Sequence, residues 1–451
     1  MAKLKVTIIG AGSFFTNAWI RDIVLSDKLE GGTFALVDVD EERLELSAEM
    51  ARKLVSEAGA AWNVRASTDR EQLLSGSDYL INTIEVAGIE NVKEDYEIPK
   101  RYGVDQCIGD TTGPGGIMKA LRTVPTWLSI LEDAEQLCPD ALVLNYTNPM
   151  HMMTLAANRA SDMDVVGLCH SVQGTSRQLA DYLNVPYEEL DWDCAGINHM
   201  SWFTKLEHEG ENLYPELRKR ARDPEFREQD PVRFEMAEQF GYFVTESSGH
   251  FSEYLPYFRK NKDLIDRYCG EGYKGESGFY SKNWPEWREK LDEFRRKWIN
   301  GEVIPKELTE GTPGLEDFNP EERSNEYGSY IIEAGETGEP EVIYGNFPNE
   351  GLISNLPDGG IVEVKTLVDE NGFHPCVFGK LPEQLAALNR SNMAVHELAV
   401  QSILEEDREA AINAFMLDPL TAAVATPEEI REMAEELFRR EEEFIPDYLM
   451  E

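Results

Sequence analysis

The first half of the chain alternates short apolar runs with amphipathic segments. Apolar runs rich in β-branched residues predict strands, and apolar positions at helical spacing predict helices between them. This alternation is typical of a doubly wound parallel sheet, an α/β fold whose ligand crevice lies at the carboxyl ends of the strands. The predicted strands are 4–9, 33–38, 79–84, 141–146 and 165–168, and the predicted helices are 17–26, 41–58, 121–137 and 175–183.

The pattern changes near residue 190. Beyond it, alternating apolar and polar positions predict antiparallel strands, whereas residues 208–320 are charged, aromatic and rich in proline and glycine, with few clean periods. The antiparallel strands are expected at 191–197, at 201–207 and within 341–368, and two final helices at 381–405 and 427–443.

This change divides the chain into a doubly wound domain at 1–190 and an α+β domain at 191–451. A length of 451 residues provides core enough for two or three domains. Because no low-complexity linker separates the halves, we expect them to share an interface, with the functional site between them.

The charge balance excludes several classes of partner. The chain carries 85 Asp and Glu against 43 Lys and Arg, a net charge of -42, spread along its whole length. Such a field repels nucleic acid and anionic membranes. No apolar run has the length of a membrane span, and the N-terminus runs directly into a strand, without room for a signal peptide. We therefore expect a soluble, cytoplasmic protein that acts on a small molecule, with its six scattered cysteines reduced.

A glycine-rich turn follows the first predicted strand. In Gly10-Ala11-Gly12-Ser13 the first glycine permits a tight turn and the second lets the backbone approach a pyrophosphate at a helix start. Phe15 stands where the third glycine of a dinucleotide fingerprint would be. Asp38 ends the second strand, where an acid can bind a ribose 2′-hydroxyl, which favours NAD over NADP. A generic strand-to-helix turn is the alternative.

Two possible metal ligands also close predicted strands. Cys169 and His170 follow strand 165–168, and His199 follows strand 191–197. A buried cysteine is ordinarily a small apolar filler and a lone histidine a satisfied polar group. Here both types face one crevice, and two protein ligands leave positions open for substrate, which suits a catalytic metal. Ligand softness alone suggests zinc or cobalt.

Three further segments carry candidate chemistry. Residues 110–116 (DTTGPGG) are too glycine-rich for regular structure and predict a loop over the site. Asn148, after the next strand, either orients a polyhydroxyl ligand or caps the helix that follows. Between 245 and 254, the residues alone do not choose an acid–base group among His250, Glu253 and Tyr254.

Together these segments resemble the NAD-dependent family 4 glycoside hydrolases, in particular their α-galactosidase branch. The resemblance runs nearly end to end and implies a lactate/malate-dehydrogenase-like architecture with a Rossmann N-terminal domain. The most similar stretches, beside the glycine-rich turn, are 110–123 (DTTGPGGIMKALRT), 144–150 (LNYTNPM), 167–175 (GLCHSVQGT), 194–200 (CAGINHM), 241–254 (GYFVTESSGHFSEY) and 342–346 (VIYGN).

The resemblance implies a redox-neutral hydrolysis that retains the anomeric configuration. NAD⁺ takes a hydride from sugar C3, a base removes the acidified C2 proton, and the leaving group departs from C1. Water then adds at C1 and NADH returns its hydride. The cofactors implied are NAD, bound at Gly10, Gly12, Ser13 and Asp38, and Mn²⁺, which replaces the zinc or cobalt suggested by ligand softness.

The resemblance also implies roles for individual residues. Cys169 and His199 match the metal ligands. His170 stands where the phospho-sugar branch has an acid that protonates the leaving group. Tyr254 is the nearest match to the family's base, with His250 as runner-up. No basic cluster for a sugar phosphate is evident in the matching segments.

We therefore expect an α-galactosidase acting on melibiose-like substrates. An α-glucosidase or uronic acid α-glycosidase of the same family is the alternative within this chemistry, and a 2-hydroxy-acid dehydrogenase, which would produce net NADH, is the alternative outside it. A non-catalytic nucleotide-binding regulator is disfavoured by the Cys, His and Asn residues at strand ends. Family relatives imply a homo-oligomer, either a dimer or a tetramer.

The acidic surface also predicts a halophilic character. Salt screens repulsion between surface charges, so activity and stability should rise with salt concentration. Thermal unfolding and activity measured across a salt series test this expectation, and full stability in dilute buffer would contradict it.

Overall fold

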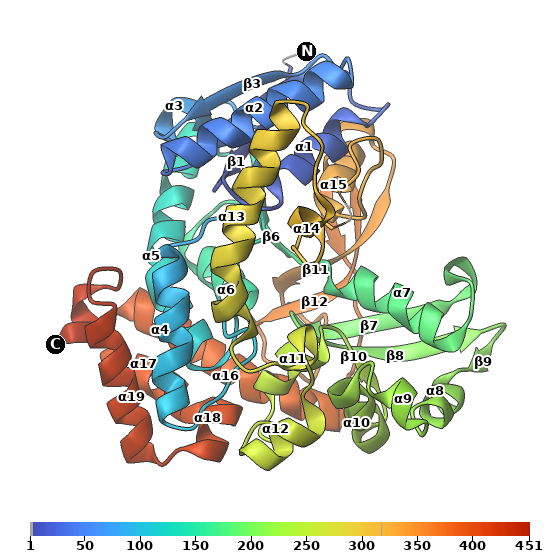
Figure 1. The fold of residues 1–451 in the computed structure, drawn as a ribbon, viewed down its shortest axis with the longest axis vertical. Helices are drawn as coiled ribbons and strands as arrows, with labels where there is room; N and C mark the ends of the chain where they lie inside the picture. Colours follow the sequence, from blue (N-terminus) through green and yellow to red (C-terminus); the bar gives the residue numbers. More distant parts are fainter. Residues whose placement is uncertain (1–2, 317) are drawn as a thin grey trace.

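The computed structural model describes residues 3–316 and 318–451 (Figure 1). Its strands are β1 (Leu4–Ile9), β2 (Gly32–Val37), β3 (Asn63–Ser67), β4 (Tyr79–Asn82), β5 (Leu142–Asn145), β6 (Val165–Leu168), β7 (Asp191–Ile197), β8 (Met200–His208), β9 (Glu211–Asn212), β10 (Phe243–Val244), β11 (Glu341–Pro348), β12 (Ile361–Asp369) and β13 (Gly372–Pro375).

The α-helices are α1 (Thr16–Val24), α2 (Glu41–Glu57), α3 (Glu71–Leu74), α4 (Gly88–Arg101), α5 (Gly113–Leu137), α6 (Met150–Ala160), α7 (Ser171–Leu183), α8 (Tyr214–Arg220), α9 (Pro224–Arg227), α10 (Pro231–Phe240), α11 (Ser248–Phe251), α12 (Lys262–Tyr268), α13 (Phe279–Ile299), α14 (Lys306–Thr309), α15 (Tyr327–Thr337), α16 (Glu383–Glu405), α17 (Arg408–Leu417), α18 (Pro419–Val424) and α19 (Pro427–Arg440). The described residues also form the 3₁₀ turns η1 (Tyr187–Glu189), η2 (Ser252–Tyr254), η3 (Gly272–Lys274) and η4 (Asp447–Met450).

The strands form one continuous sheet. Strands β1 to β6 are parallel in the order β3-β2-β1-β4-β5-β6, which is the order of a dinucleotide-binding Rossmann sheet. β11 then pairs antiparallel with β6, and β12, β7, β8 and β10 extend the sheet beyond it. The predicted α/β class is confirmed, and the sheet runs without a break across the division near residue 190.

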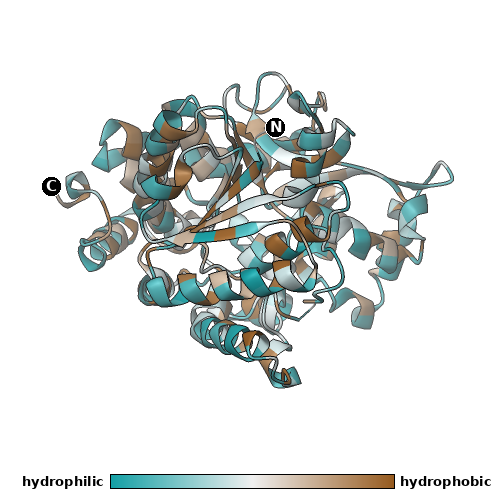
Figure 2. Ribbon diagram, turned by 90° about the horizontal axis from the view of Figure 1, so that it is seen from above, coloured by the Kyte–Doolittle hydropathy of each residue, from teal (hydrophilic) through white to brown (hydrophobic). Residues whose placement is uncertain are grey.

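The parallel strands are buried on both faces, which explains their strong apolar signal. Val6 and Ile8 pack with α1 and α2 on one face, whereas Ile9 and Val37 pack with α5 and α6 on the other. In Figure 2 the hydrophobic positions lie toward the interior of the layers and the hydrophilic ones cover the outer helix faces. Sequence prediction missed β3, an edge strand whose five residues are only partly buried.

The glycine-rich segment 110–116 is the clearest correction. Its glycine content predicts a loop, but α5 begins at Gly113 and runs 25 residues. A Cβ at Gly115 would lie 2.3 Å from the Gly109 carbonyl oxygen, and one at Gly116 would lie 2.3 Å from the Thr111 carbonyl carbon. These glycines therefore let the first turn of the helix pack against the backbone that precedes it.

The region without clean periods, 208–320, also contains regular structure. Its longest helix, α13, has 21 residues and packs against α2 and α4, across the front of the molecule in Figure 1. The two predicted final helices correspond to α16 and α19, with α17 and α18 between them. Across the described residues, no helix combines the length and apolar character that crossing a bilayer requires.

Two histidines form a buried pair between α6 and α16. The rings of His151 and His396 lie with their centroids 4.5 Å apart, and both side chains are almost fully buried. No ring nitrogen of either has a hydrogen-bond partner among the described residues. Burial lowers the pKa of His151 to about 3 and lowers the pKa of His396 as well. Both imidazoles are therefore neutral in the folded protein.

This pair predicts acid sensitivity of the fold. Unfolded histidines take up protons below about pH 6.5, whereas the folded pair does not, so stability is lost as pH falls below that value. Each histidine adds up to about 1.4 kcal/mol per pH unit to the slope of the free energy of unfolding against pH. We expect the His151→Leu, His396→Leu double variant to lose less stability than wild type between pH 6.5 and 4, measured by urea unfolding.

The exposed His374 provides the matched control for that comparison. Its ring faces Asp369 at 3.0 Å, and its side chain is 46% exposed. His374→Gln should retain the wild-type slope. If the free energy of unfolding falls equally steeply with pH in the double variant and in wild type, the buried pair does not cause the loss of stability in acid.

Candidate active site

The glycine-rich turn after β1 is shaped by close backbone packing. Gly10 has φ +83°, and a Cβ there would lie 2.5 Å from the carbonyl oxygen of Thr83. The Gly12 amide donates to Asp38 Oδ2 at 2.7 Å. Ser13 follows, before α1 begins at Thr16. The four residues predicted for nucleotide binding are thus gathered at the carboxyl ends of β1 and β2, where such a ligand is held.

Arg295 of α13 supports this turn from the second half of the chain. Its guanidinium is fully buried and donates to the carbonyl oxygens of Gly12 (3.1 Å) and Ser13 (2.6 Å) and to Asn17 Oδ1 (2.9 Å). Burial lowers the pKa of Arg295 to about 10, so the group stays cationic at neutral pH. Sequence reasoning missed this residue, because only the folding of α13 onto α2 brings it near residue 12.

Three possible metal ligands meet where the two halves join. Cys169 Sγ lies 3.3 Å from His199 Nε2, and His199 Nε2 lies 3.5 Å from Glu246 Oε2. One ligand atom from each residue lies within 4.8 Å of the others. With bond lengths of about 2.0–2.3 Å, these separations suit a single cation. The structure thus brings Cys169 and His199 together and adds Glu246, which sequence reasoning missed.

The backbone at this cluster is unusual. His199, in the turn between β7 and β8, has φ +63°, and Glu246, after β10, has φ +73°. Residues with a side chain rarely adopt this left-handed region, and such conformations concentrate at functional sites.

The charges of the cluster are set by burial and by its histidines. Burial raises the pKa of the Cys169 thiol to about 11. Burial alone would also raise the pKa of Glu246, but His199 and His250 beside it lower it overall. The cluster therefore presents a neutral thiol and an ionised carboxylate at neutral pH, and a cation bound there would displace the thiol proton.

Tyr254 and His250 line the cluster. Tyr254 Oη lies 3.3 Å from His199 Nδ1, so Nδ1–H can donate to it when Nε2 faces a metal. Burial, Glu246 and Asp110 raise the pKa of Tyr254 well above its usual value. His250 Nδ1 lies 3.7 Å from Glu246 Oε1, and its buried Nε2 has no hydrogen-bond partner among the described residues.

Glu253 is excluded as an acid–base group. Its carboxylate is fully buried and accepts hydrogen bonds from the amides of Cys107 (2.7 Å), Ile108 (2.6 Å) and Gly109 (3.0 Å) and from Gln106 Nε2 (3.0 Å). Both oxygens are therefore occupied in fixing residues 106–109, so Glu253 is structural.

A polar wall continues the site toward the start of α5. Asn148 Nδ2 donates to Asp110 Oδ2 at 3.2 Å, and Asp110 Oδ1 lies 3.8 Å from His250 Nε2. Lys119 Nζ is buried against Glu85 Oε2 at 2.7 Å. No side chain caps α6, so the capping role considered for Asn148 is wrong. Asp110 begins the segment predicted to lie over the site, whereas Lys119 and Glu85 were not predicted as site residues.

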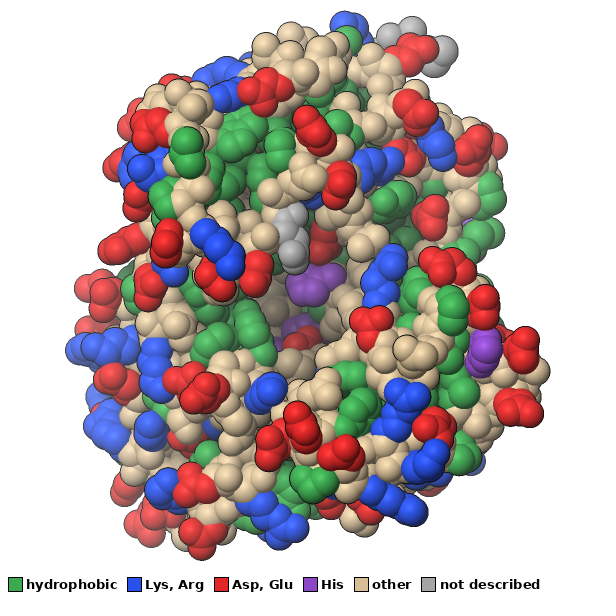
Figure 3. Space-filling model, turned by 45° about the vertical axis from the view of Figure 1, so that its right-hand side comes forward, with side chains coloured by type: hydrophobic (Ala, Val, Ile, Leu, Met, Phe, Trp, Pro, Cys, Tyr) green, Lys and Arg blue, Asp and Glu red, His purple; other side chains and the backbone are tan. Residues whose placement is uncertain are grey.

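His170 lies at the open side of the site. Its side chain is 61% exposed, and Nδ1 lies 3.5 Å from Glu326 Oε1. A carboxylate at this distance favours the protonated imidazole. In Figure 3 the molecule is hollowed at the centre of one face, and histidine and acidic side chains lie at the bottom of the hollow.

Comparison with known proteins identifies relatives along the full chain. Residues 5–185 match the sequence profile described as "Family 4 glycosyl hydrolase", and residues 194–421 match that of its C-terminal domain. An α-galactosidase of Bacillus subtilis (strain 168) is 39% identical over 447 residues, 98% of this chain and 99% of the relative. An α-galactosidase of Rhizobium meliloti (strain 1021) is 37% identical over 454 residues, 99% of this chain and 90% of the relative.

Solved structures share the fold. A 6-phospho-α-glucosidase from gut microorganisms, in complex with NAD and Mn²⁺, superposes with a TM-score of 0.81 at 23% identity, covering 98% of this chain and 99% of that one. A malate dehydrogenase of Cryptosporidium parvum superposes with a TM-score of 0.52 at 14% identity, covering 90% of this chain and 100% of that one. The predicted malate-dehydrogenase-like architecture is therefore confirmed.

Proposed function

This chain belongs to the family 4 glycosyl hydrolases, and within that family we propose that it is an α-galactosidase dependent on NAD and Mn²⁺. One observation carries the proposal: Cys169, His199 and Glu246 converge at the carboxyl edge of a sheet of dinucleotide-binding order. The two α-galactosidases, at 39% and 37% identity, support galactose as the sugar whose glycosidic bond is hydrolysed.

The residues present fit both cofactors. Gly10 and Gly12 keep the turn free of side chains where a pyrophosphate would lie, and Asp38 stands where a ribose hydroxyl would bind. A thiol, an imidazole and a carboxylate form a mixed donor set for a divalent cation. When bound, NAD⁺ would accept and return a hydride, and Mn²⁺ would polarise the adjoining sugar oxygen and so acidify the C2 proton.

The chain's own side chains then carry the proton transfers. Tyr254 would take the C2 proton as a phenolate, which a cation held by the cluster would favour against the effect of burial, because its oxygen lies beside that cluster; His250 is the second candidate. His170 protonates the departing oxygen at C1, since it lies at the open side of the site beside Glu326. Asn148 orients a sugar hydroxyl with Asp110.

The charges of the site favour a neutral sugar. Glu246 and Asp110 are both ionised, since neighbouring cations lower the pKa of each despite burial. The buried cation Lys119 is already held by Glu85. A sugar carboxylate or phosphate beside this wall would face the ionised Glu246 and Asp110, so we expect poor hydrolysis of α-galacturonides and 6-phosphoglycosides.

The decisive assay is nitrophenol release from nitrophenyl α-galactoside in reducing buffer. NAD⁺ and Mn²⁺ are omitted singly and together, after bound cofactor has been removed. We expect activity only with both, no net build-up of NADH, and at least a hundredfold lower kcat/KM with nitrophenyl α-galacturonide. Tyr254→Phe should also abolish exchange of the C2 proton with D₂O; loss in His250→Asn alone would move the base to His250.

Other outcomes would redirect the assignment. Hydrolysis indifferent to NAD⁺ would overturn the mechanism. NADH formed from a 2-hydroxy acid, without hydrolysis of any α-glycoside, would place the protein among dehydrogenases.

Glu246 provides a separate test of the metal site. Glu246→Gln removes the anionic ligand that faces His199 Nε2, so we expect Mn²⁺ affinity to fall about 10- to 100-fold, measured by titration followed by electron paramagnetic resonance. Because the Cys169 thiol must lose its proton, wild-type affinity should also rise with pH.

Glu326→Gln is the matched control for that titration. Glu326 is a half-buried acid that faces His170 and lies outside the three-ligand cluster. The Glu326→Gln variant should bind Mn²⁺ with the affinity of wild type. Equal affinities in wild type and Glu246→Gln would remove Glu246 from the ligand set.

A further inference from the structure

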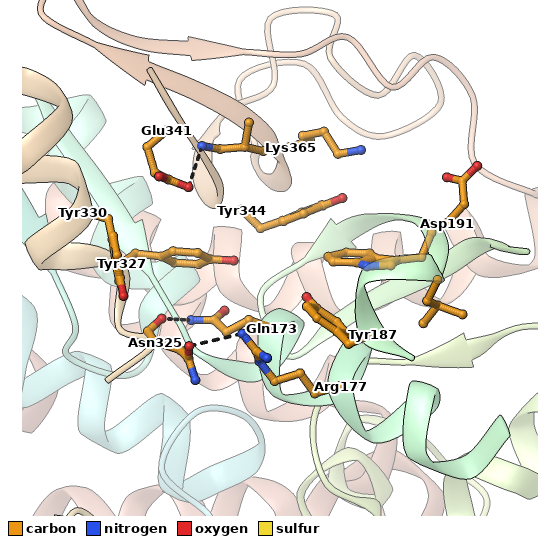
Figure 4. Close-up of a pocket in the computed structure, with 13 residues that line it drawn as sticks. Gln173, Arg177, Tyr187, Asp191, Asn325, Tyr327, Tyr330, Glu341, Tyr344 and Lys365 are labelled. Atoms are coloured by element: carbon orange, nitrogen blue, oxygen red, sulfur yellow. Dashed lines mark hydrogen bonds between the residues drawn. The ribbon is translucent and has the colours of Figure 1, made fainter. Parts of the chain in front are cut away.

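A second cavity, lined in part by α7, lies beside the active site. It has a volume of about 470 Å³, within the range of about 300–1,000 Å³ typical of small-molecule sites. Strands β7, β11 and β12 provide one side, and α7, η1 and the start of α15 provide the others (Figure 4). Five aromatic side chains line it: Tyr187, Trp192, Tyr327, Tyr330 and Tyr344.

The aromatic rings are held in place by their neighbours. Trp192 and Tyr344 stack with centroids 5.1 Å apart and planes 22° from parallel. The Arg177 guanidinium lies over the Tyr187 ring at 4.4 Å. In Figure 4 the rings of Tyr187, Tyr327 and Tyr344 surround one open space. Fixed aromatic faces bind flat or weakly polar ring surfaces at low entropic cost.

The polar groups of the cavity balance in charge. Its acids are Asp191 and Glu341, and its bases are Arg177 and Lys365. Both bases are engaged: Arg177 donates to Asn325 Oδ1 at 3.2 Å, and Lys365 Nζ lies 3.4 Å from Asp193. The two acids offset the two bases, so the lining has no net charge that would select an anionic ligand. Carboxylates that accept and amides that donate suit a ligand rich in hydroxyls.

The cavity shares its wall with the active site. Gln173 and Arg177 follow His170 by three and seven residues along α7, about 5 and 10 Å at 1.5 Å per residue. Across the wall, Gln173 Nε2 donates to the Asn325 carbonyl at 3.3 Å. The next residue, Glu326, faces His170, whereas Asn325 and Tyr327 on either side line the cavity.

We propose that this cavity is a sugar-binding subsite that holds a leaving-group ring of longer, neutral α-galactosides. The inference rests on the proposed function and extends it to substrate range. His170, assigned to the leaving oxygen, is exposed at the open side of the site and precedes Gln173 of the cavity by three residues, so a chain extending from C1 over the exposed edge of the shared wall would reach the cavity. An aromatic face would then pack against one pyranose or furanose ring, and its hydroxyls would bind the polar groups.

The test compares two substrates in the holoenzyme. Nitrophenyl α-galactoside has only a small aryl leaving group, whereas the trisaccharide raffinose extends two rings beyond galactose. The readout is the ratio of kcat/KM for raffinose to kcat/KM for nitrophenyl α-galactoside. We expect this ratio to fall about tenfold in Trp192→Ala and in Tyr187→Ala. Because the two variants are independent, the test can still be made with one of them if the other does not fold.

Tyr257→Ala is the matched control, because Tyr257 is a 40% exposed aromatic that does not line the cavity. Its ratio should equal that of wild type. An unchanged ratio in both cavity variants overturns the subsite. A changed oligomeric mass in these variants, with the ratio unchanged, overturns it as well and assigns the cavity to a contact between copies.

Failure of the proposed function gives a different pattern. If wild type hydrolyses neither substrate, the α-galactosidase assignment fails, and raffinose binding is then measured by calorimetric titration. Binding that is lost in Trp192→Ala retains the cavity as a carbohydrate site, whereas equal or absent binding in both proteins overturns it.

Discussion

The pairing of β6 with β11 is the contact on which the site depends. β6 is parallel to β5 on one side and antiparallel to β11 on the other, with Leu168 opposite Gly345. Through β12 and β7 the same sheet then reaches the turn that carries His199. Cys169 follows β6 directly, so the registers of β6 with β11, β11 with β12 and β12 with β7 together place Cys169 beside His199, 30 positions further along the chain.

Close packing of backbone at that junction leaves little room for variation. A Cβ at Gly167 in β6 would lie 2.6 Å from Thr154 Oγ1 and 3.1 Å from Asn346 Cβ. Asn346 Nδ2 donates to the Gly167 carbonyl at 3.1 Å, and the buried Glu363 receives a hydrogen bond from Ser201 Oγ at 2.6 Å. These side-chain bonds join β6, β11, β12 and β8 beneath the cluster, so the two halves hold it as a rigid unit.

The sequence contained much of this arrangement. Parallel strands buried on both faces produce apolar runs that are easy to recognise, and residues at their carboxyl ends meet at one edge, which is why Cys169 and His199 could be placed together. Glu246 could not, because its position depends on a left-handed turn after a two-residue strand. Arg295 could have been suspected, since Trp287, Leu291 and Phe294 are buried at helical spacing on α13. That pattern predicts which face of α13 is packed, but it does not identify Gly12 and Ser13 as the partners of Arg295, since they lie far away in the sequence.

Forming the Cys169, His199 and Glu246 cluster costs free energy in the folded protein, and a bound cation would offset that cost. Two of its three members occupy left-handed backbone, each costing about 1–3 kcal/mol. The buried Cys169 thiol and the buried rings of His199 and His250 also lie beside the partly buried Glu246 carboxylate, and removing such polar groups from bulk solvent costs free energy unless they are paired. Strain of this kind persists only where surrounding packing determines it, which here is the sheet junction. A bound divalent ion would pair with the three ligand groups and so offset that cost. Metal occupancy and the local stability of residues 169, 199 and 246 are therefore expected to be linked: whatever stabilises this junction also prepares the ion's ligands.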